Sequence, residues 1–188
     1  MSPPPAWLVV IDMQNVFADP ASPWHVPRFA QTVAPILRLT RAYAPRVLFT
    51  RFVAPTVPAG AWRVFYEAWP FALTQPDHPM WEIVEPLRDA VPAARHAACA
   101  KGVFSKWGPE LAGPAGGGAI VLAGVSTDGC VLATALAAAD AGVRVMVVGE
   151  ACAGIDDESH AAALEVLRPL DPLVRVISAA QALEEATV

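Results

Sequence analysis

The chain has 188 residues, of which 55% are hydrophobic and 16% are charged, and its formal net charge at pH 7 is −5. This length suffices for one domain with a sizeable core, and we expect a single domain over residues 1–188. The negative charge balance, without any basic cluster, argues against nucleic acid or an anionic membrane surface as the main partner. No apolar run is long enough to cross a bilayer.

The N-terminus and the cysteines indicate in which cellular compartment the protein is expected. The first residues lack the charged-then-apolar order of a secretory signal. The three cysteines, Cys99, Cys130 and Cys152, are an odd set that fits a reducing compartment better than a disulfide framework. We therefore expect a cytoplasmic protein.

The first fifty residues predict a strand–helix–strand unit. Trp7–Ile11 is a continuous apolar run, as in a parallel strand that is covered on both faces. Phe29–Tyr43 has the apolar spacing of a helix, although it contains Pro35, and Arg46–Thr50 predicts a second strand. The crossover in such a βαβ unit should be right-handed.

Residues 51–91 break the regular pattern and are rich in aromatic residues and proline, with a short helix expected within 81–87. A loop region of this length is usually functional or packed on something, so we interpret it as a pocket wall, a subunit interface, or both. Our candidates for an aromatic pocket wall are drawn from this region and its flanks, and each could equally belong to the core or an interface. They are Phe17, Trp62, Tyr66, Trp69 and Trp107.

The second half of the chain alternates strands and helices. A weak strand is expected over 93–100 and a turn over 113–118, which precedes a strand and is therefore not a dinucleotide fingerprint. Further strands are predicted at 119–123, 143–148 and 174–177, with helices over 132–141, from 157 or 158, and from 179, and a loop over 149–157. The alternation indicates a three-layer α/β/α sandwich with a mainly parallel, Rossmann-like sheet.

Cys130 is placed by this pattern in the first turn of the helix that follows the strand at 119–123. The N–H groups there lack intrahelical partners, and the helix dipole is positive at that end. We therefore expect this thiol to ionise more easily than a free one and to act as a nucleophile. The alternative is an unreactive, buried small side chain.

Asp12 and Lys101 also follow predicted strands. Taken singly, the aspartate could be a helix cap and the lysine a solvated surface charge. Because the carboxyl ends of parallel strands share one edge of a sheet, we expect both to converge with Cys130. The aspartate would take the thiol proton, and the lysine would keep the carboxylate ionised, which completes a nucleophile, base and orienting group. None of the four histidines follows a predicted strand, which weighs against a Cys–His pair.

Three segments, in this order, resemble the isochorismatase-like cysteine hydrolases. They are Val9–Gln14, Lys101–Ser105 and Gly124–Val131 with Thr134. The resemblance spans nearly the whole chain, and it implies the α/β fold described above and an enzyme that hydrolyses C–N bonds other than peptide bonds.

The same resemblance implies roles for particular residues. Asp12, Lys101 and Cys130 would form the catalytic triad. The peptide between Val125 and Ser126 would be cis, and the N–H groups of Ser126 and Cys130 would form an oxyanion hole. We expect hydrolysis of a small amide or ureido group through a thioester, without a cofactor, by a homo-oligomer that is a dimer or a tetramer.

Metal-binding nicotinamidases of the family carry an aspartate and two histidines after the second strand. Here Arg51–Pro55 and residues 61–63 offer no such set, so we expect no metal and doubt nicotinamidase activity.

Two alternatives remain open. One is hydrolysis of the vinyl ether of an isochorismate-type dianion, with Asp12 as the acid and Arg51, Arg63 or Lys106 binding the anion. The other is a non-catalytic binding or redox-sensing module, in which Cys130 would be oxidised but never acylated.

Overall fold

The centre of the protein is a sheet of five strands in the order β2-β1-β5-β6-β7, seen in a computed structural model that describes residues 4–91, 99–115 and 118–187. Every neighbouring pair in it is parallel. The strands are β1 (Trp7–Ile11), β2 (Val47–Phe49), β5 (Ala119–Val125), β6 (Arg144–Ala153) and β7 (Val174–Ile177). The apolar runs of the sequence therefore form the parallel sheet that we predicted.

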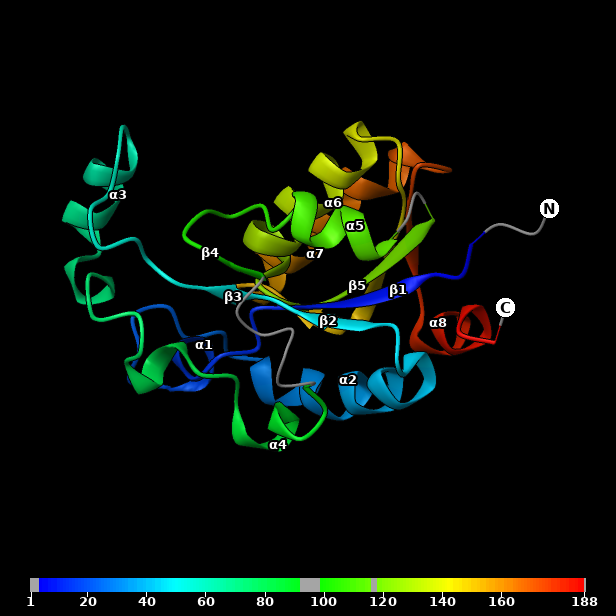
Figure 1. Ribbon diagram of the computed structural model, residues 1–188, viewed down its shortest axis with the longest axis horizontal. Coiled ribbons are helices and arrows are strands. Elements are labelled where there is room, and N and C mark those ends of the chain that lie inside the picture. Colours follow the sequence, from blue (N-terminus) through cyan, green and yellow to red (C-terminus); the bar gives the residue numbers. More distant parts are fainter. Residues whose placement is uncertain (1–3, 92–98, 116–117, 188) are drawn as a thin grey trace.

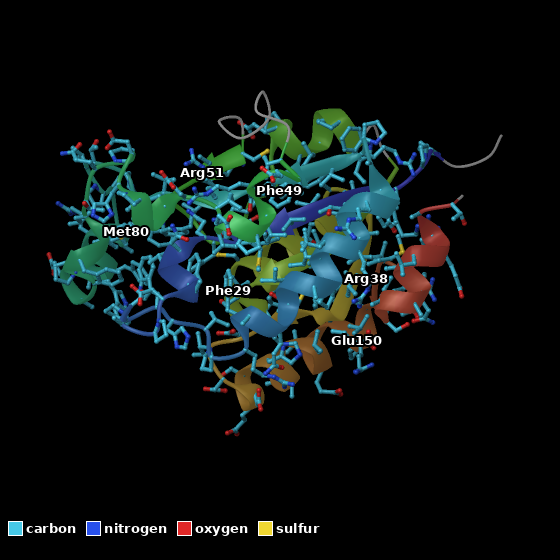
Figure 2. The ribbon with its side chains drawn as sticks, turned by 90° about the horizontal axis from the view of Figure 1, so that it is seen from below. Phe29, Arg38, Phe49, Arg51, Met80 and Glu150 are labelled. Carbon is cyan, nitrogen blue, oxygen red and sulfur yellow. The ribbon has the colours of Figure 1, made fainter. Side chains whose placement is uncertain are left out.

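Helices cover both faces of this sheet (Figure 1). On one face lie α2 (Phe29–Tyr43) and α8 (Ala179–Glu185), which Figure 2 shows from their own side, in front of the strands. On the other face lie α5 (Pro109–Ala115), α6 (Leu132–Asp140) and α7 (Asp157–Leu167). The three-layer α/β arrangement expected from the sequence is confirmed.

The α2–α8 layer is held by local features that the sequence encodes. The apolar stripe of α2 buries Ile36, Leu39 and Tyr43. The Tyr43 hydroxyl donates a 2.7 Å hydrogen bond to the Ala182 carbonyl of α8, and burial raises the pKa of Tyr43 to about 12. At its start, α8 has a capping box in which Ser178 and the Gln181 side chain satisfy each other's backbone N–H groups.

The strand order reverses direction between β1 and β5. From β1 the chain moves outward to β2, whereas from β5 it moves the opposite way to β6 and β7. Open parallel sheets bind ligands at the carboxyl ends of the strands that flank such a point. At these ends Ile11 pairs with Gly124, whose φ is 117° and where an added Cβ would collide with the Ile11 backbone. Only glycine fits there.

The aromatic-rich region extends beyond the carboxyl ends of the sheet (Figure 1). Its first residues form β3 (Arg51–Phe52), which pairs in parallel with β4 (Ala100–Lys101) in a separate two-stranded sheet. The rest consists of short helices, with α3 projecting farthest from the body of the protein. They are α3 (Trp62–Ala68), η1 (Pro70–Ala72), η2 (Pro79–Trp81) and α4 (Glu85–Arg88), and α1 (Asn15–Ala18) lies beside η2.

Three local expectations differ from the structure. Residues 113–115 belong to α5 rather than to a turn, although this helix contains Pro114. The loop expected from residue 149 is strand as far as Ala153, because β5 shifts register after Leu122 and its last residues pair with residues 152 and 153 of β6. Of the weak strand at 93–100, only Ala100 lies in β4, and residues 93–98 lie outside the described part of the chain.

A short helical turn, η6 (Arg168–Leu170), follows α7. None of the helices in the described ranges is long and apolar enough to span a bilayer.

Candidate active site

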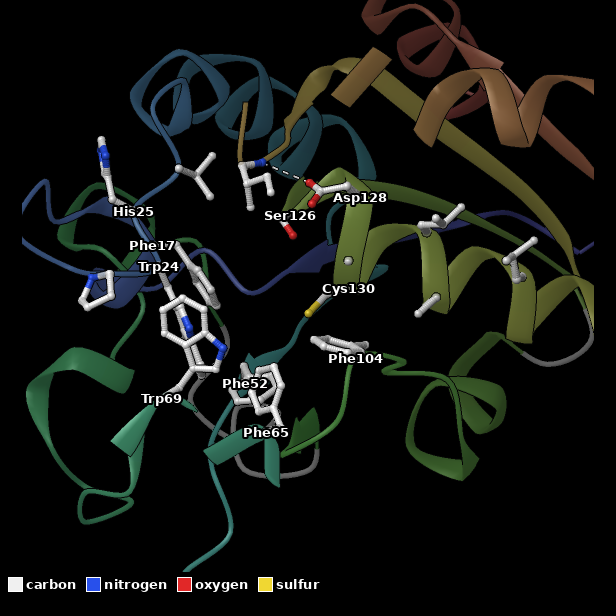
Figure 3. Close-up of a pocket in the computed structure, with 17 residues that line it drawn as sticks. Phe17, Trp24, His25, Phe52, Phe65, Trp69, Phe104, Ser126, Asp128 and Cys130 are labelled. Carbon is white, nitrogen blue, oxygen red and sulfur yellow. Dashed lines mark hydrogen bonds between the residues drawn. The ribbon is translucent and has the colours of Figure 1, made fainter. Parts of the chain in front are cut away.

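Cys130 lies in η5 (Thr127–Val131), a π-helical turn that joins the end of β5 to α6. π-Helical turns are rare in proteins, and those that occur are often found at functional sites. The residue is 5% exposed, and Figure 3 shows its sulfur directed into a pocket.

Asp12 follows β1 directly and is wholly buried. Its φ of 49° lies in the left-handed region, which is unfavourable for an aspartate by about 1–3 kcal/mol and is typical of functional sites. The Thr50 hydroxyl, at the end of β2, donates a 2.6 Å hydrogen bond to Oδ1 of Asp12 and accepts one of 3.2 Å from its N–H. Thr50, which the sequence did not single out, therefore fixes the orientation of the carboxylate.

Lys106 provides the positive charge beside Asp12. Its side chain is wholly buried, and its Nζ lies 3.0 Å from Oδ2 of Asp12. Nζ also donates a 2.8 Å hydrogen bond to the Val103 carbonyl and lies 4.6 Å from the centroid of the Phe52 ring. Removing either member of such a buried pair typically costs about 3–5 kcal/mol, because the other charge is left buried alone.

Lys101, which we expected beside Asp12, points elsewhere. Its Nζ donates a 2.9 Å hydrogen bond to the Trp107 carbonyl and lies 3.4 Å from Oε2 of Glu110. The reason is that Lys101 ends β4, a strand of the small sheet, and so does not share the carboxyl edge of β1 and β5. Lys106, which we considered only as an anion-binding residue, has the position predicted for Lys101.

Thr134 connects Cys130 to Lys106. Its hydroxyl donates a 2.6 Å hydrogen bond to the Cys130 carbonyl and accepts one of 2.9 Å from the Lys106 N–H. The threonine is wholly buried. A single side chain thus fixes the spacing between the turn that carries the sulfur and the loop that carries the ammonium.

The environment of Cys130 raises the pKa of its thiol. Burial is the largest cause, followed by the charge of Asp12, and the charge of Lys106 acts in the opposite direction. This reverses our expectation from the helix N-terminus, because burial and, after it, the charge of Asp12 disfavour the thiolate.

The raised pKa favours the neutral thiol of Cys130 beside the ion-paired Asp12. Among the described residues, none donates a well-directed hydrogen bond to Oδ2 of Asp12, although the Lys106 ammonium is paired with it. A lone pair of Oδ2 is thus available to take the thiol proton when the sulfur attacks.

The Val125–Ser126 peptide is cis in the structure. Ser126 lines the same cavity as Gly129 and Cys130, so backbone from the end of β5 and from η5 meets at the sulfur. These are the residues for which the resemblance implies an oxyanion hole.

The cavity at Cys130 has a volume of about 690 Å³ and a largely aromatic wall (Figure 3). Its rings come from four separate segments of the chain. They are Phe17, Trp24, Phe52, Phe65, Trp69 and Phe104. Of these, Phe17 and Trp69 were among our candidates, whereas the other four were not.

Trp62, Tyr66 and Trp107 do not line the cavity. Tyr66 is buried behind it, with its ring 5.2 Å from that of Phe65 and 6.0 Å from that of Trp62. Trp24 was missed because it lies in a proline-broken loop without periodicity. In the fold its ring meets those of Phe17, Phe52, Phe65 and Trp69 at centroid distances of 5.5–6.2 Å.

The fold and these side chains together define a class of protein. It is an α/β protein that holds a cysteine, a carboxylate and an ammonium at the carboxyl edge of a parallel sheet. The sequence of residues 6–181 matches the family model of the isochorismatase domain. The chain therefore belongs to the isochorismatase family and is a hydrolase of that family.

Solved structures agree with this assignment at the level of the fold. A cysteine hydrolase from Pseudomonas syringae pv. phaseolicola superposes with a TM-score of 0.83 at 20% identity, covering 100% of this chain and 94% of that one. N-carbamoylsarcosine amidase from Thermoplasma acidophilum gives 0.70 at 20%, covering 94% and 97%. Pyrazinamidase of Pyrococcus horikoshii, in complex with zinc, gives 0.70 at 23%, covering 93% and 99%. No curated protein matches the chain significantly.

A metal like that of the pyrazinamidase requires a set of ligands. Within residues 4–91, 99–115 and 118–187, no three histidine, cysteine, aspartate or glutamate side chains come together so that they could hold an ion. The described residues therefore do not fit a metal site.

Proposed function

We propose that the protein hydrolyses a carbon–nitrogen bond of a small amide or ureido compound through a thioester on Cys130. The observation that carries this proposal is the buried Asp12–Lys106 ion pair beside Cys130, the member of the three that lines the cavity. The amidase names among the similar structures point to the same reaction class.

In the proposed mechanism, Asp12 takes the Cys130 proton as the sulfur attacks the carbonyl carbon. The N–H groups of Ser126 and Cys130 hold the tetrahedral oxyanion, and losing one such donor typically costs about 100- to 1,000-fold in rate. Asp12 then gives its proton to the leaving nitrogen, and a water that it activates hydrolyses the thioester. Lys106, in place of Lys101, orients the carboxylate and balances its charge.

Vinyl-ether hydrolysis of a dianion fits the cavity less well. Among the described residues, no lysine or arginine lines it, so neither Arg51 nor Arg63 is placed to bind an anion there. Lys106 is buried against Asp12. A redox sensor also fits poorly, because oxidation proceeds through the thiolate and the pKa of Cys130 is raised.

The proposal is tested by ammonia release from a panel of primary amides. Cys130→Ser should lower kcat/KM by at least about 1,000-fold, as loss of a nucleophile does in comparable enzymes. Cys152→Ser is the matched control, because Cys152 is also a buried free thiol but lies outside this cavity. Full turnover by Cys130→Ser would exclude the thioester.

We also propose that the protein forms a dimer or a tetramer. Exposed apolar side chains support this, among them Val57 before α3, Val64 in α3 and Leu73 after η1. A sedimentation profile that contains only monomer would contradict it.

A further inference from the structure

We propose that the substrate is an amide without an anionic group whose acyl part is bulky and apolar, large enough to place a chain or ring against Trp24 and Trp69. The inference rests on the proposed function and deepens it by naming the class of substrate. It follows from the size of the cavity, the chemistry of its wall and the position of the sulfur within it.

The cavity is too large to be filled by a substrate with a very small acyl group. A volume of about 690 Å³ lies in the range of sites for drug-sized ligands, which is about 300–1,000 Å³. One water takes roughly 30 Å³ of liquid volume, so an acetamide of four heavy atoms would fill only a small part of this space. The remainder would hold water against aromatic rings, which is unfavourable.

The wall of the cavity offers almost no partner for an anionic substrate. In the described part of the chain, its ionisable lining side chains other than Cys130 are His25 and Asp128. Oδ1 of Asp128 accepts a 3.1 Å hydrogen bond from the Ile155 N–H, and the carboxylate carries a negative charge. A carboxylate on the substrate would therefore meet no lysine or arginine in the described wall, and Asp128 would repel it.

The lysines near the cavity do not change this balance. The Lys106 ammonium is paired with Asp12 and donates to the Val103 carbonyl. The Lys101 ammonium is held by the Trp107 carbonyl and Glu110. Neither lysine lines the cavity.

The rings form a continuous series of contacts that begins beside the sulfur. In Figure 3, Phe104 lies beside Cys130, and the Phe104 ring is 5.9 Å from that of Phe65 between centroids. Contacts among the rings hold this wall in place, since Trp24 lies 6.0 Å from Phe65 and 6.1 Å from Trp69 between centroids. A carbonyl carbon at the sulfur would thus direct an apolar acyl group along the aromatic wall.

A matched series of primary amides tests the inference, with kcat/KM measured for acetamide, hexanamide and adipamic acid. Hexanamide should exceed acetamide by at least about 100-fold, because each added methylene in an apolar site contributes about fourfold. Adipamic acid has the same chain length but ends in a carboxylate. It should react at least about 100-fold more slowly than hexanamide.

The outcomes separate the inference from the proposed function. If acetamide or adipamic acid reacts as well as hexanamide, and Cys130→Ser abolishes that reaction, the inference is overturned while the function stands. If none of the three amides is hydrolysed, the inference is overturned. If, in addition, no amide of the wider panel is hydrolysed, the proposed function is overturned as well.

A charge added to the wall supplies a second test that depends little on folding. Leu136 lines the cavity from α6 and is 37% exposed, so Leu136→Arg places a cation at the wall from an accessible helix position. It should shift the ratio of the two kcat/KM values toward adipamic acid by at least about tenfold. Leu170→Arg, which is equally exposed at 37% but outside the cavity, should leave the ratio as it is. Equal ratios in the two variants would contradict the claim that the charge of the cavity wall decides against an anionic acyl group.

Discussion

At the scale of single residues, the lysine that faces the carboxylate determines how the site is built. Both Lys101 and Lys106 lie in the segment that resembles the family or directly after it. Only Lys106 is wholly buried and paired with Asp12. Spacing in the sequence could not decide between them, because the decision depends on the direction in which the loop after β4 returns.

Replacing each lysine in turn separates their roles. Lys106→Met should lower kcat/KM by at least about 100-fold and destabilise the fold by about 3–5 kcal/mol, because Asp12 is left buried without its partner. It should also raise the pH at which Cys130 is alkylated, since the charge of Lys106 acts to lower the pKa of that thiol. Kinetics and chemical unfolding on the same samples check both effects.

Lys101→Met is the matched control. Its partner Glu110 is exposed, so the loss of stability should be about 1 kcal/mol. The pH profile of Cys130 alkylation should not change. If Lys101→Met abolished activity while Lys106→Met retained it, the assignment of the orienting lysine would be reversed.

The raised pKa of Cys130 gives a second prediction at this scale. Asp12→Asn removes the negative charge that raises the pKa of the thiol and leaves the positive charge of Lys106 beside it. The pKa should therefore fall, so that at pH 8 a larger fraction is thiolate and iodoacetamide reacts faster. Hydrolysis should nevertheless fall by about 100- to 10,000-fold, because the general base is gone.

Peptide mapping of the alkylated protein over a pH series measures this effect at Cys130 itself. Slower alkylation of Asp12→Asn than of the wild type at every pH would show that the carboxylate does not raise the pKa.

At the scale of elements, the site is assembled from a few strand ends. β1 supplies Asp12, β2 supplies Thr50, and the turn after β5 supplies Cys130. The loop before α5 is the exception, because Lys106 does not follow a strand of the main sheet and is held in place through Thr134.

Thr134→Val tests this link. Valine has nearly the same shape but removes the hydroxyl bonded to the Cys130 carbonyl and leaves the Lys106 N–H without its acceptor, which typically costs about 1–3 kcal/mol for a buried group. Activity should fall at least about tenfold, and the pH profile of Cys130 alkylation should shift upward as the Lys106 charge moves away.

Thr134→Ser is the control, since it keeps the hydroxyl and should restore most of the activity and the profile. If Thr134→Val lost stability alone, with an unchanged kcat and an unchanged profile, Thr134 would serve the fold and not the site.

At the scale of the whole molecule, the sequence predicts the central sheet and its helices better than the residues that line the cavity. Apolar runs such as Trp7–Ile11 are long, uninterrupted and bounded by polar residues, so both the strand and the edge at which it ends can be inferred. That edge is sufficient to bring Asp12 and Cys130 together, because both follow the ends of adjacent parallel strands.

The rest depends on contacts between distant segments. The aromatic wall gathers Trp24 from one loop, Phe65 from α3 and Phe104 from another loop, and no local pattern connects them. The pKa of Cys130 also depends on such contacts, because burial and the Asp12 charge outweigh the local effect of the helix end.

The most direct measurement is the mass of the enzyme quenched in acid during turnover of hexanamide. We expect the peptide that contains Cys130 to gain the mass of a hexanoyl group, and Lys106→Met to form the same adduct more slowly. Hydrolysis that proceeds while Cys130 carries no adduct at any time, or an adduct on Cys152 instead, would contradict a thioester at the Asp12–Lys106–Cys130 site.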